Sequence, residues 1–165
     1  MSMKPIYTIG HGSRRSEELL ELLKKYNIAY LIDVRSQPYS KFHPQFSKNN
    51  LQHFVEENNI RYVFMGDLLG GRPTNPDCYR NGKVDYDILK TKDFFRKGIE
   101  RLKTAYEQDL SVAIMCSERN PAECHRARLI GRVLTEENIP VRHITEKGTL
   151  KSQAEVMSEI NTKLF

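Results

Sequence analysis

Short apolar runs alternate along the chain with longer segments whose apolar residues recur at helical spacing. The short runs predict buried strands at residues 6–10, 29–34, 61–65, 110–115 and 141–144. The segments between them predict amphipathic helices at residues 16–25, 47–57, 92–103 and 125–134. Parallel strands require helical crossovers, which place helices on both faces of a sheet. The order therefore predicts a three-layer α/β/α, Rossmann-like domain with a mainly parallel sheet of about five strands.

Two segments depart from this alternation. Residues 66–85 are rich in Gly, Pro, Asn and Asp, which predicts a long irregular connection. Loops of that length are commonly functional or mobile. Residues 147–165 carry a weaker amphipathic pattern, which predicts a C-terminal helix.

The composition is that of a water-soluble globule, with 39% apolar and 28% charged residues and a mean hydropathy of −0.59. The chain has 165 residues, so we expect one α/β domain over residues 1–165 rather than two. The longest apolar runs are far shorter than the roughly 20 residues that span a bilayer, which excludes a membrane protein. No secretory leader is recognisable, so we expect a cytoplasmic location. The three cysteines, Cys78, Cys116 and Cys124, are an odd number in such a chain, and we expect free thiols.

Polar side chains follow several predicted strands at their carboxyl ends. They are His11 after the first strand, Asp33, Arg35 and Ser36 at the second, and Cys116 and Glu118 at the fourth. Ligands of open α/β sheets bind outside the carboxyl ends of the strands. We therefore expect these side chains to meet in one crevice.

Each of these residues has a structural and a functional interpretation. His11 is either a glycine-flanked turn residue or an acid–base group. Asp33 follows core-type residues, where an unpaired carboxylate is costly, and Arg35 lies on the same side of an extended chain. The pair therefore either stabilises the fold or binds a ligand, with Asp33 orienting the histidine or accepting a ribose hydroxyl. Glu118 is a second acid–base candidate, and Arg72 is expected to close over an anionic ligand.

The segment after the fourth strand carries the most chemistry. Cys116 leaves a buried strand, and Cys124, His125 and Arg126 begin the next predicted helix. Unpaired amides at a helix start attract anions and favour thiolates. We therefore expect Cys116 or Cys124 to be reactive, with His125 or His11 as base and Arg126 holding a phosphate or carboxylate. The alternative is that Cys116 is a small core residue at a strand end.

Other familiar sites do not fit the spacing. The sixth residue after Cys116 is Ala122, which excludes the phosphatase type of cysteine loop closed by arginine. The cysteines and histidines lack the short paired spacing of a zinc site, so no metal is predicted. The glycines at residues 70–71 match neither a Walker nor a dinucleotide motif, and no cofactor is identified.

The net charge of +5 permits binding to phosphate or nucleic acid. Basic and aromatic residues are interleaved in the loops on the presumed functional side. They are Arg14, Arg15, Lys41, Arg72, Arg80, Arg119, Arg126 and Arg128, with Tyr39, Phe42, Phe46 and Tyr79. Such loops hold phosphates and stack bases. Alternatively, Phe42 and Phe46 fill the core and the charges are solvated.

Four ordered motifs resemble the domain of unknown function 488 family. They are YTIGH at residues 7–11, IDVRS at 32–36 followed by Pro38 and PQF at 44–46, LGGR at 69–72, and CSERNPAECHR at 116–126. The resemblance extends over residues 6–144. The family pattern commonly has serine directly after Gly-His, whereas here Gly12 stands at that position and Ser13 follows. The resemblance implies an α/β fold and no established reaction.

The sequence leaves three functional hypotheses. The first is an enzyme that acts on a small phosphorylated or nucleotide-like substrate in a Cys/His/Asp/Arg crevice. The second is a non-catalytic nucleic-acid-binding module in which the arginines contact phosphates and the thiols only pack. The third is a thiol redox or metal-sensing domain.

Overall fold

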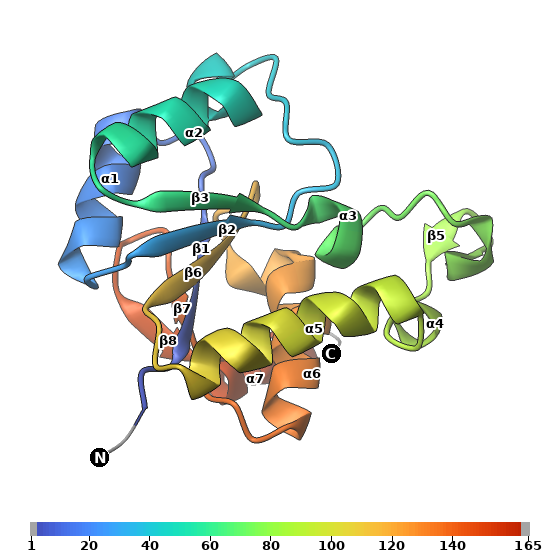
Figure 1. Cartoon of the computed structure of the whole chain (residues 1–165). Coiled ribbons are helices and arrows are strands. Elements are labelled where there is room, and N and C mark those ends of the chain that lie inside the picture. The colour runs from blue at the N-terminus through green and yellow to red at the C-terminus, as the bar shows by residue number, and fades with distance from the viewer. Residues whose placement is uncertain (1–2, 163–165) are drawn as a thin grey trace.

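A six-stranded, mainly parallel sheet forms the middle layer of the structure, a computed structural model that describes residues 3–162. Its strands, in spatial order, are β3 (Arg61–Phe64), β2 (Tyr30–Asp33), β6 (Val112–Cys116), β1 (Ile6–Gly10), β7 (Val141–Ile144) and β8 (Leu150–Ser152) (Figure 1). Only β8 pairs antiparallel, with β7. The predicted three-layer α/β fold is thus confirmed, with one more strand than expected.

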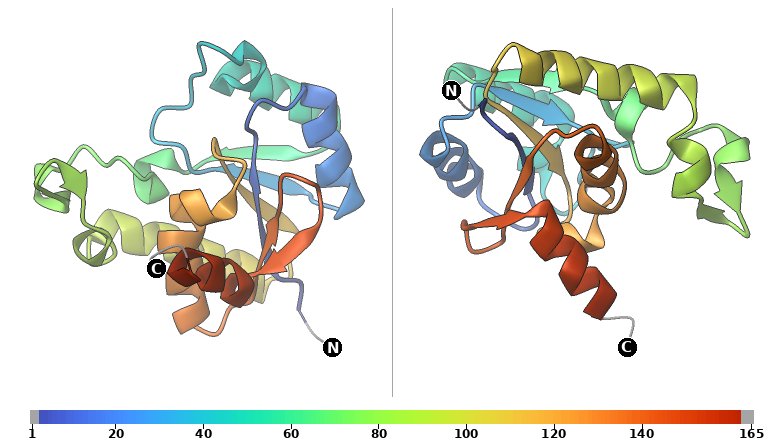
Figure 2. Two further views of the ribbon diagram at one scale, coloured as in Figure 1. Left: turned by 180° about the vertical axis from the view of Figure 1, so that it is seen from behind. Right: turned by 90° about the horizontal axis from the view of Figure 1, so that it is seen from below.

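Helices cover both faces of this sheet because its strands alternate apolar residues between the two faces. In β6, Val112 and Ile114 pack with one core cluster, whereas Ala113 and Met115 pack with the other. The helices α1 (Ser16–Lys25) and α2 (Lys48–Glu57) contribute buried leucines to the second cluster. The helices α5 (Asp93–Glu107) and α6 (Arg132–Glu136) cover the opposite face, and the view from below in Figure 2 separates α1 from α5. Within residues 3–162, no helix has the length and apolarity needed to cross a membrane.

The strand register brings the carboxyl ends of the central strands to one level. Gly10 pairs with Cys116, and Asp33 pairs with Met115. The backbone pairing continues beyond the strands, because His11 N–H donates to the Cys116 carbonyl over 3.0 Å. Side chains that follow β1, β2 and β6 are therefore neighbours, as expected from the sequence.

The predicted irregular connection at residues 66–85 contains regular structure. It begins with the short helix α3 (Gly66–Leu69), then forms a 3-10 turn η2 (Pro76–Cys78) and a hairpin of β4 (Tyr79–Arg80) and β5 (Lys83–Val84). The hairpin turns at Asn81 and Gly82, which both have positive φ angles of 53° and 78°. Asn-Gly is the preferred pair for such a two-residue turn, so the signal was present in the sequence. Together with α4 (Tyr86–Leu89), the hairpin projects from one side of the sheet (Figures 1 and 2).

The last part of the chain also differs from the prediction. The helix expected at residues 125–134 is a π-helical segment η4 (Arg126–Gly131) that continues into α6. The helix expected at 147–165 begins only at α7 (Gln153–Thr162), because β8 first pairs with β7. Residues 163–165 of that prediction lie outside the described residues. Two further 3-10 turns are η1 (Pro44–Phe46) and η3 (Pro121–Glu123).

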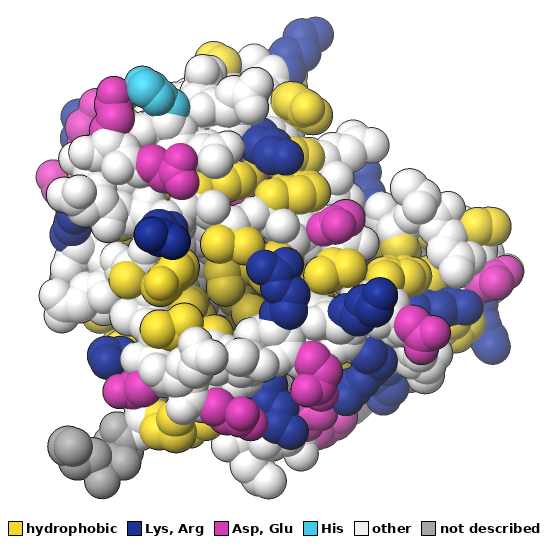
Figure 3. Space-filling view, viewed as in Figure 1, with side chains coloured by type: hydrophobic (Ala, Val, Ile, Leu, Met, Phe, Trp, Pro, Cys, Tyr) yellow, Lys and Arg dark blue, Asp and Glu magenta, His cyan; other side chains and the backbone are white. Residues whose placement is uncertain are grey.

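Strand β3 is one edge of the sheet, and in Figure 3 hydrophobic side chains reach the surface over it with Lys and Arg around them. Val63 and Phe64 are only partly buried there. The ammonium of Lys48 lies 4.3 Å from the centre of the Phe64 ring, a cation–π contact that covers part of this edge. Charges next to an edge strand also oppose pairing with another chain.

Gly10 is the residue at which β1 approaches the loop after β6, and a Cβ there would overlap the Glu118 carbonyl. We expect Gly10→Ala to lower the free energy of unfolding by about 2 kcal/mol, because neither backbone segment has room to move. Ser13→Ala, an exposed change in the same loop, is the control and should alter it by less than about 0.5 kcal/mol. Urea denaturation measures both, and equal stability of Gly10→Ala and the wild type would contradict this packing.

Candidate functional site

A cavity of about 470 Å³ lies at the carboxyl ends of β1, β2 and β6. Eight of the ten site residues expected from the sequence line it: His11, Arg35, Ser36, Arg72, Cys116, Glu118, Cys124 and His125. Asp33 and Arg126 do not line it. Sequence reasoning missed further lining residues, among them Tyr86 and Glu123. Tyr86 follows the hairpin of β4 and β5, which lies in the connection of residues 66–85 that the sequence predicted to be irregular.

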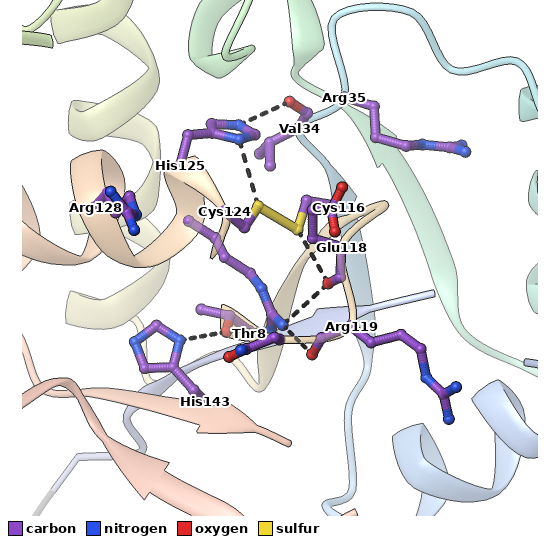
Figure 4. The surroundings of a disulfide bond; sticks show 12 residues. Thr8, Val34, Arg35, Cys116, Glu118, Arg119, Cys124, His125, Arg128 and His143 are labelled. Carbon is purple, nitrogen blue, oxygen red and sulfur yellow. Dashed lines mark hydrogen bonds between the residues drawn. A yellow bond between two sulfur atoms is a disulfide. The ribbon is translucent and has the colours of Figure 1, made fainter. Parts of the chain in front are cut away.

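Cys116 and Cys124 form a disulfide at the wall of this cavity (Figure 4). The expectation of three free thiols is therefore wrong for this pair, and only Cys78, which is buried, remains a free thiol. The turn η3 between the two cysteines brings Cys124 back to Cys116. In this turn the Asn120 side chain accepts from the N–H of Ala122 over 3.0 Å. An odd cysteine count shows that at least one cysteine is unpaired, but it does not exclude this local loop.

His125 lies beside the disulfide as a neutral imidazole. Its Nε2–H donates to the Val34 carbonyl over 3.2 Å, which leaves the Nδ1 lone pair 3.5 Å from Cys124 Sγ. Burial lowers the pKa of His125 to about 4, with a smaller lowering effect from Arg126. The ring packs against Gly71, which closes one side of the cavity. In a dithiol form of the protein, Nδ1 would accept a hydrogen bond from the Cys124 thiol.

Asp33 binds the Arg35 side chain and fixes its position at the cavity, but Asp33 itself does not line the cavity. Arg35 donates from Nε to Asp33 Oδ1 over 2.9 Å and from Nη2 to Oδ2 over 2.8 Å. The hydroxyl of Tyr62, a partner that the sequence did not indicate, donates to Asp33 Oδ2 over 2.5 Å. Burial and the neighbouring carboxylate raise the pKa of Tyr62. Asp33 is 0% exposed, so it stabilises the fold and does not contact a ligand. Arg35 lines the cavity and remains available to a ligand.

His11 is the second neutral imidazole of the site. Its Nδ1–H donates to the Gly12 carbonyl over 2.8 Å, so Nε2 carries a lone pair and lies 3.4 Å from Arg35 Nη1. Its ring stacks on Phe46, with 4.6 Å between ring centres. Burial, with a smaller contribution from the charge of Arg35, lowers the pKa of His11 to about 4. At neutral pH His11 is therefore a proton acceptor, positioned by Phe46 and Gly12.

Arg126 was expected to bind the ligand directly, but the structure places its guanidinium in the interior. Arg126 is 0% exposed. It donates from Nη1 to Thr8 Oγ1 over 2.8 Å, and from Nη2 to the carbonyls of Glu118 and Arg119 over 3.2 and 2.9 Å. Among the residues that the structure describes, no carboxylate lies within salt-bridge distance of it. Burial lowers the pKa of Arg126 to about 9, so it remains charged at neutral pH.

A chain of buried hydrogen bonds keeps Arg126 in this position. The Thr8 hydroxyl donates to His143 Nδ1, and His143 Nε2–H donates to Gln153 Oε1, both over 2.6 Å. Gln153 Nε2 in turn donates to the Ala127 carbonyl over 2.9 Å. These directions follow from Arg126, which can only donate, and together they connect β1, β7, α7 and η4. The sequence placed Thr8 in the first predicted strand and Gln153 in the predicted C-terminal helix, and gave no sign that they belong to one hydrogen-bond network.

The rim of the cavity carries charges of both signs. Arg72 is exposed, and its backbone N–H donates to Ser36 Oγ over 2.8 Å, which fixes the loop beside the cavity. Glu118 and Glu123 are exposed carboxylates on the opposite segment. No three His, Cys, Asp or Glu side chains within residues 3–162 are arranged to hold a metal ion. The site is therefore built from arginines, neutral imidazoles and sulfur, next to two carboxylates.

Comparison with known proteins gives one match. The model of the family described as "Domain of unknown function DUF488" matches residues 15–133. No curated protein and no solved structure matches the chain.

The buried histidines predict how stability depends on pH. Burial lowers the pKa of His143 from 6.5 to about 4, so between these values the unfolded chain binds a proton that the folded protein does not. The free energy of unfolding should therefore fall as the pH decreases from 6.5 to 4, by up to about 3 kcal/mol for this group. In urea denaturation at several pH values, His143→Gln should flatten that slope.

The matched control is His53→Gln, because the His53 side chain is 77% exposed and its loss should leave the slope unchanged. Parallel slopes for His143→Gln and the wild type would show that His143 is protonated in the folded protein.

Proposed function

The chain belongs to the DUF488 family, whose description assigns no reaction, and we propose that it is an enzyme acting on a small phosphorylated or nucleotide-like substrate. The proposed binding site is the cavity at the carboxyl ends of β1, β2 and β6. The observation that carries the proposal is the buried, charged Arg126 without an acidic partner, directly beneath the cysteine loop.

A buried charge is costly unless an opposite charge compensates for it. The guanidinium of Arg126 has only neutral acceptors, and the guanidinium of Arg35 lies at the cavity above it with Nη1 not bonded to Asp33. An anion in the cavity would interact favourably with both charges. The fork formed by Nε and Nη2 of Arg35 is occupied by Asp33, so an anion would be bound by the Nη1 donor, which lies beside His11.

The size and the walls of the cavity support a nucleotide-like ligand. Small-molecule sites commonly have volumes of about 300 to 1,000 Å³, and this cavity has about 470 Å³. Tyr39 and Tyr86 both line it. Aromatic rings beside arginines allow a base to stack while a phosphate is bound.

The proposed chemical roles follow from protonation and position. His11 is neutral and accepts a proton at Nε2, and Glu118 is the second acid–base group at the rim. Cys116 in its reduced form is the nucleophile. Ser36 positions Arg72, which closes over the anionic group. Asp33 and Arg126 act as positioning residues that do not touch the substrate.

A second candidate function, binding of single-stranded nucleic acid, is favoured by one observation. Tyr39 and Phe42 are 74% and 84% exposed, with the exposed Lys41 between them. Exposed rings and a cation on one loop are typical of surfaces that stack unpaired bases. Phe46, by contrast, is 0% exposed and belongs to the core. The two functions use the same rim but differ in their dependence on Phe42.

The first test of the proposal is anion binding by calorimetry with inorganic phosphate and nucleoside monophosphates. We expect Arg72→Gln to weaken the affinity by about tenfold, equivalent to about 1.4 kcal/mol. The matched control is Arg61→Gln, which removes an exposed arginine at the opposite end of the sheet. The absence of any binding at low salt would contradict the proposal. If an oligonucleotide binds with a steep salt dependence, and Phe42→Ala rather than Arg72→Gln abolishes the binding, the nucleic-acid function is favoured instead.

The second test concerns catalysis by reduced protein. For any ligand that binds and is turned over, Cys116→Ser should lower kcat by more than about a hundredfold, because a hydroxyl is a far weaker nucleophile than a thiolate. The affinity for the ligand should stay within a factor of about two, because the anion contacts lie on the arginines. Cys78→Ser, at the buried free thiol, is the control variant. Unchanged turnover in Cys116→Ser would exclude this residue as the nucleophile.

A further inference from the structure

The disulfide lies at the boundary between the core and an open cavity, because both cysteines belong to a core cluster and both line the cavity. Cys116 and Cys124 are 2% and 5% exposed, and both line the cavity of about 470 Å³. Cys78 packs in the same core cluster as Cys116 and Cys124, but it is 0% exposed and lines none of the described cavities. A disulfide at a cavity wall is accessible to a small molecule, and thiol–disulfide exchange requires such access.

The two cysteines have different surroundings. The Glu118 carbonyl lies 3.7 Å from Cys116 Sγ and accepts from Arg126 Nη2 over 3.2 Å, so the buried positive charge is one group away from Cys116. In the reduced form, a carbonyl oxygen that accepts from the thiol favours the thiol, and the positive charge behind it acts in the opposite direction. Cys124 instead lies 3.5 Å from the unprotonated Nδ1 of His125, which can accept its thiol proton. Cys124 is the more exposed of the two and is therefore the better site of attack, which makes Cys116 the leaving group.

The anion-binding group and the disulfide lie at different parts of the cavity. In Figure 4 the Arg35 side chain extends away from the disulfide, while its backbone neighbour Val34 contacts His125. A ligand that contacts both therefore needs an anionic group separated from its reacting atom. Small thiols that carry a carboxylate or phosphate at some distance from the sulfur have this shape.

We infer that this cavity catalyses reversible thiol–disulfide exchange between the Cys116–Cys124 pair and a low-molecular-weight anionic thiol. The inference deepens the proposed function and rests on it for the binding of the anionic group. The thiolate of the ligand attacks Cys124 Sγ, the bond between the two cysteine sulfurs breaks, and its electron pair leaves on Cys116. A second ligand thiolate attacks the ligand sulfur of the mixed disulfide and releases Cys124. Two ligand thiols are thereby oxidised to a disulfide, the protein disulfide is reduced, and the two protons of the ligand thiols pass to the cysteines.

The first experiment traps the mixed disulfide. In Cys116→Ser, Cys124 is the remaining thiol at the cavity, and Cys78 is an internal control. The probes are glutathione disulfide, which is anionic, and cystamine, which is cationic. The rate of modification of each cysteine is read by peptide mass spectrometry and divided by the rate for an unstructured cysteine peptide. We expect a normalised preference of about tenfold for the anionic probe at Cys124, which Arg72→Gln should reduce and Arg61→Gln should leave unchanged.

The outcomes separate this inference from the proposed function, because phosphate affinity is measured on the same samples. If phosphate binds but Cys124 reacts no faster than Cys78, or shows no preference for the anionic probe, thiol exchange is excluded while anion binding stands. If neither phosphate binding nor exchange occurs, both are overturned.

A second experiment uses the wild type and does not depend on the folding of a variant. The protein is equilibrated in buffers of graded glutathione to glutathione disulfide ratio, then acid-quenched and alkylated. We expect Cys116 and Cys124 to change together in one two-electron transition while the protein stays folded. A pair that resists reduction until the protein unfolds is a structural crosslink, and this result would overturn the inference.

Discussion

The site depends on a positive charge that is buried without an acidic partner. The guanidinium of Arg126 is held by the Thr8 hydroxyl and by the carbonyls of Glu118 and Arg119, so it connects β1 to the loop that follows Cys116. Neutral acceptors pair with its two terminal nitrogens, while Nε is buried without a partner among residues 3–162, and these acceptors do not neutralise its charge. The resulting positive potential extends to the part of the cavity that is lined by Cys116 and Glu118. This constraint explains why the loop has a defined position.

Arg35 and Arg126, the two buried arginines among the expected site residues, have different surroundings. Arg35 is compensated by Asp33, a carboxylate that also accepts from Tyr62, so its charge is balanced and its position is rigid. Arg126 is fully buried with no carboxylate of residues 3–162 at salt-bridge distance, and Glu118 compensates its charge only in part, so it contributes a field rather than a contact. A ligand anion would contact Arg35 directly. It would be separated from Arg126 by the peptide groups of Glu118 and Arg119. In the proposed site, Arg35 would bind the anion and Arg126 would stabilise it electrostatically.

The sequence predicted the sheet, the edge at which the site forms and most of its lining residues, because these follow from local periodicity and from the general properties of parallel sheets. It predicted Arg35 as the partner of Asp33, but not Tyr62, and it did not predict Thr8 as the partner of Arg126, since these residues are brought together only by tertiary packing. The Cys116–Cys124 pair was missed for a related reason. Whether two cysteines that lie 8 residues apart meet depends on the turn between them, which cysteine counting does not describe. The Asn-Gly hairpin turn at residues 81–82 was a local signal and was predictable.

The same sulfur atom is involved in both proposed activities, and this links them. A cysteine in a disulfide has no thiolate, so Cys116 is unavailable as a nucleophile while it is bonded to Cys124. Arg35, Arg72 and His11 are unaffected by that bond, so the oxidised protein would still bind an anion. Binding and covalent chemistry are thus separable by redox state in this arrangement. A thiol that reduces the pair would at once complete its own exchange reaction and free Cys116, which makes the redox state of the cavity the variable that any assay of this protein has to control.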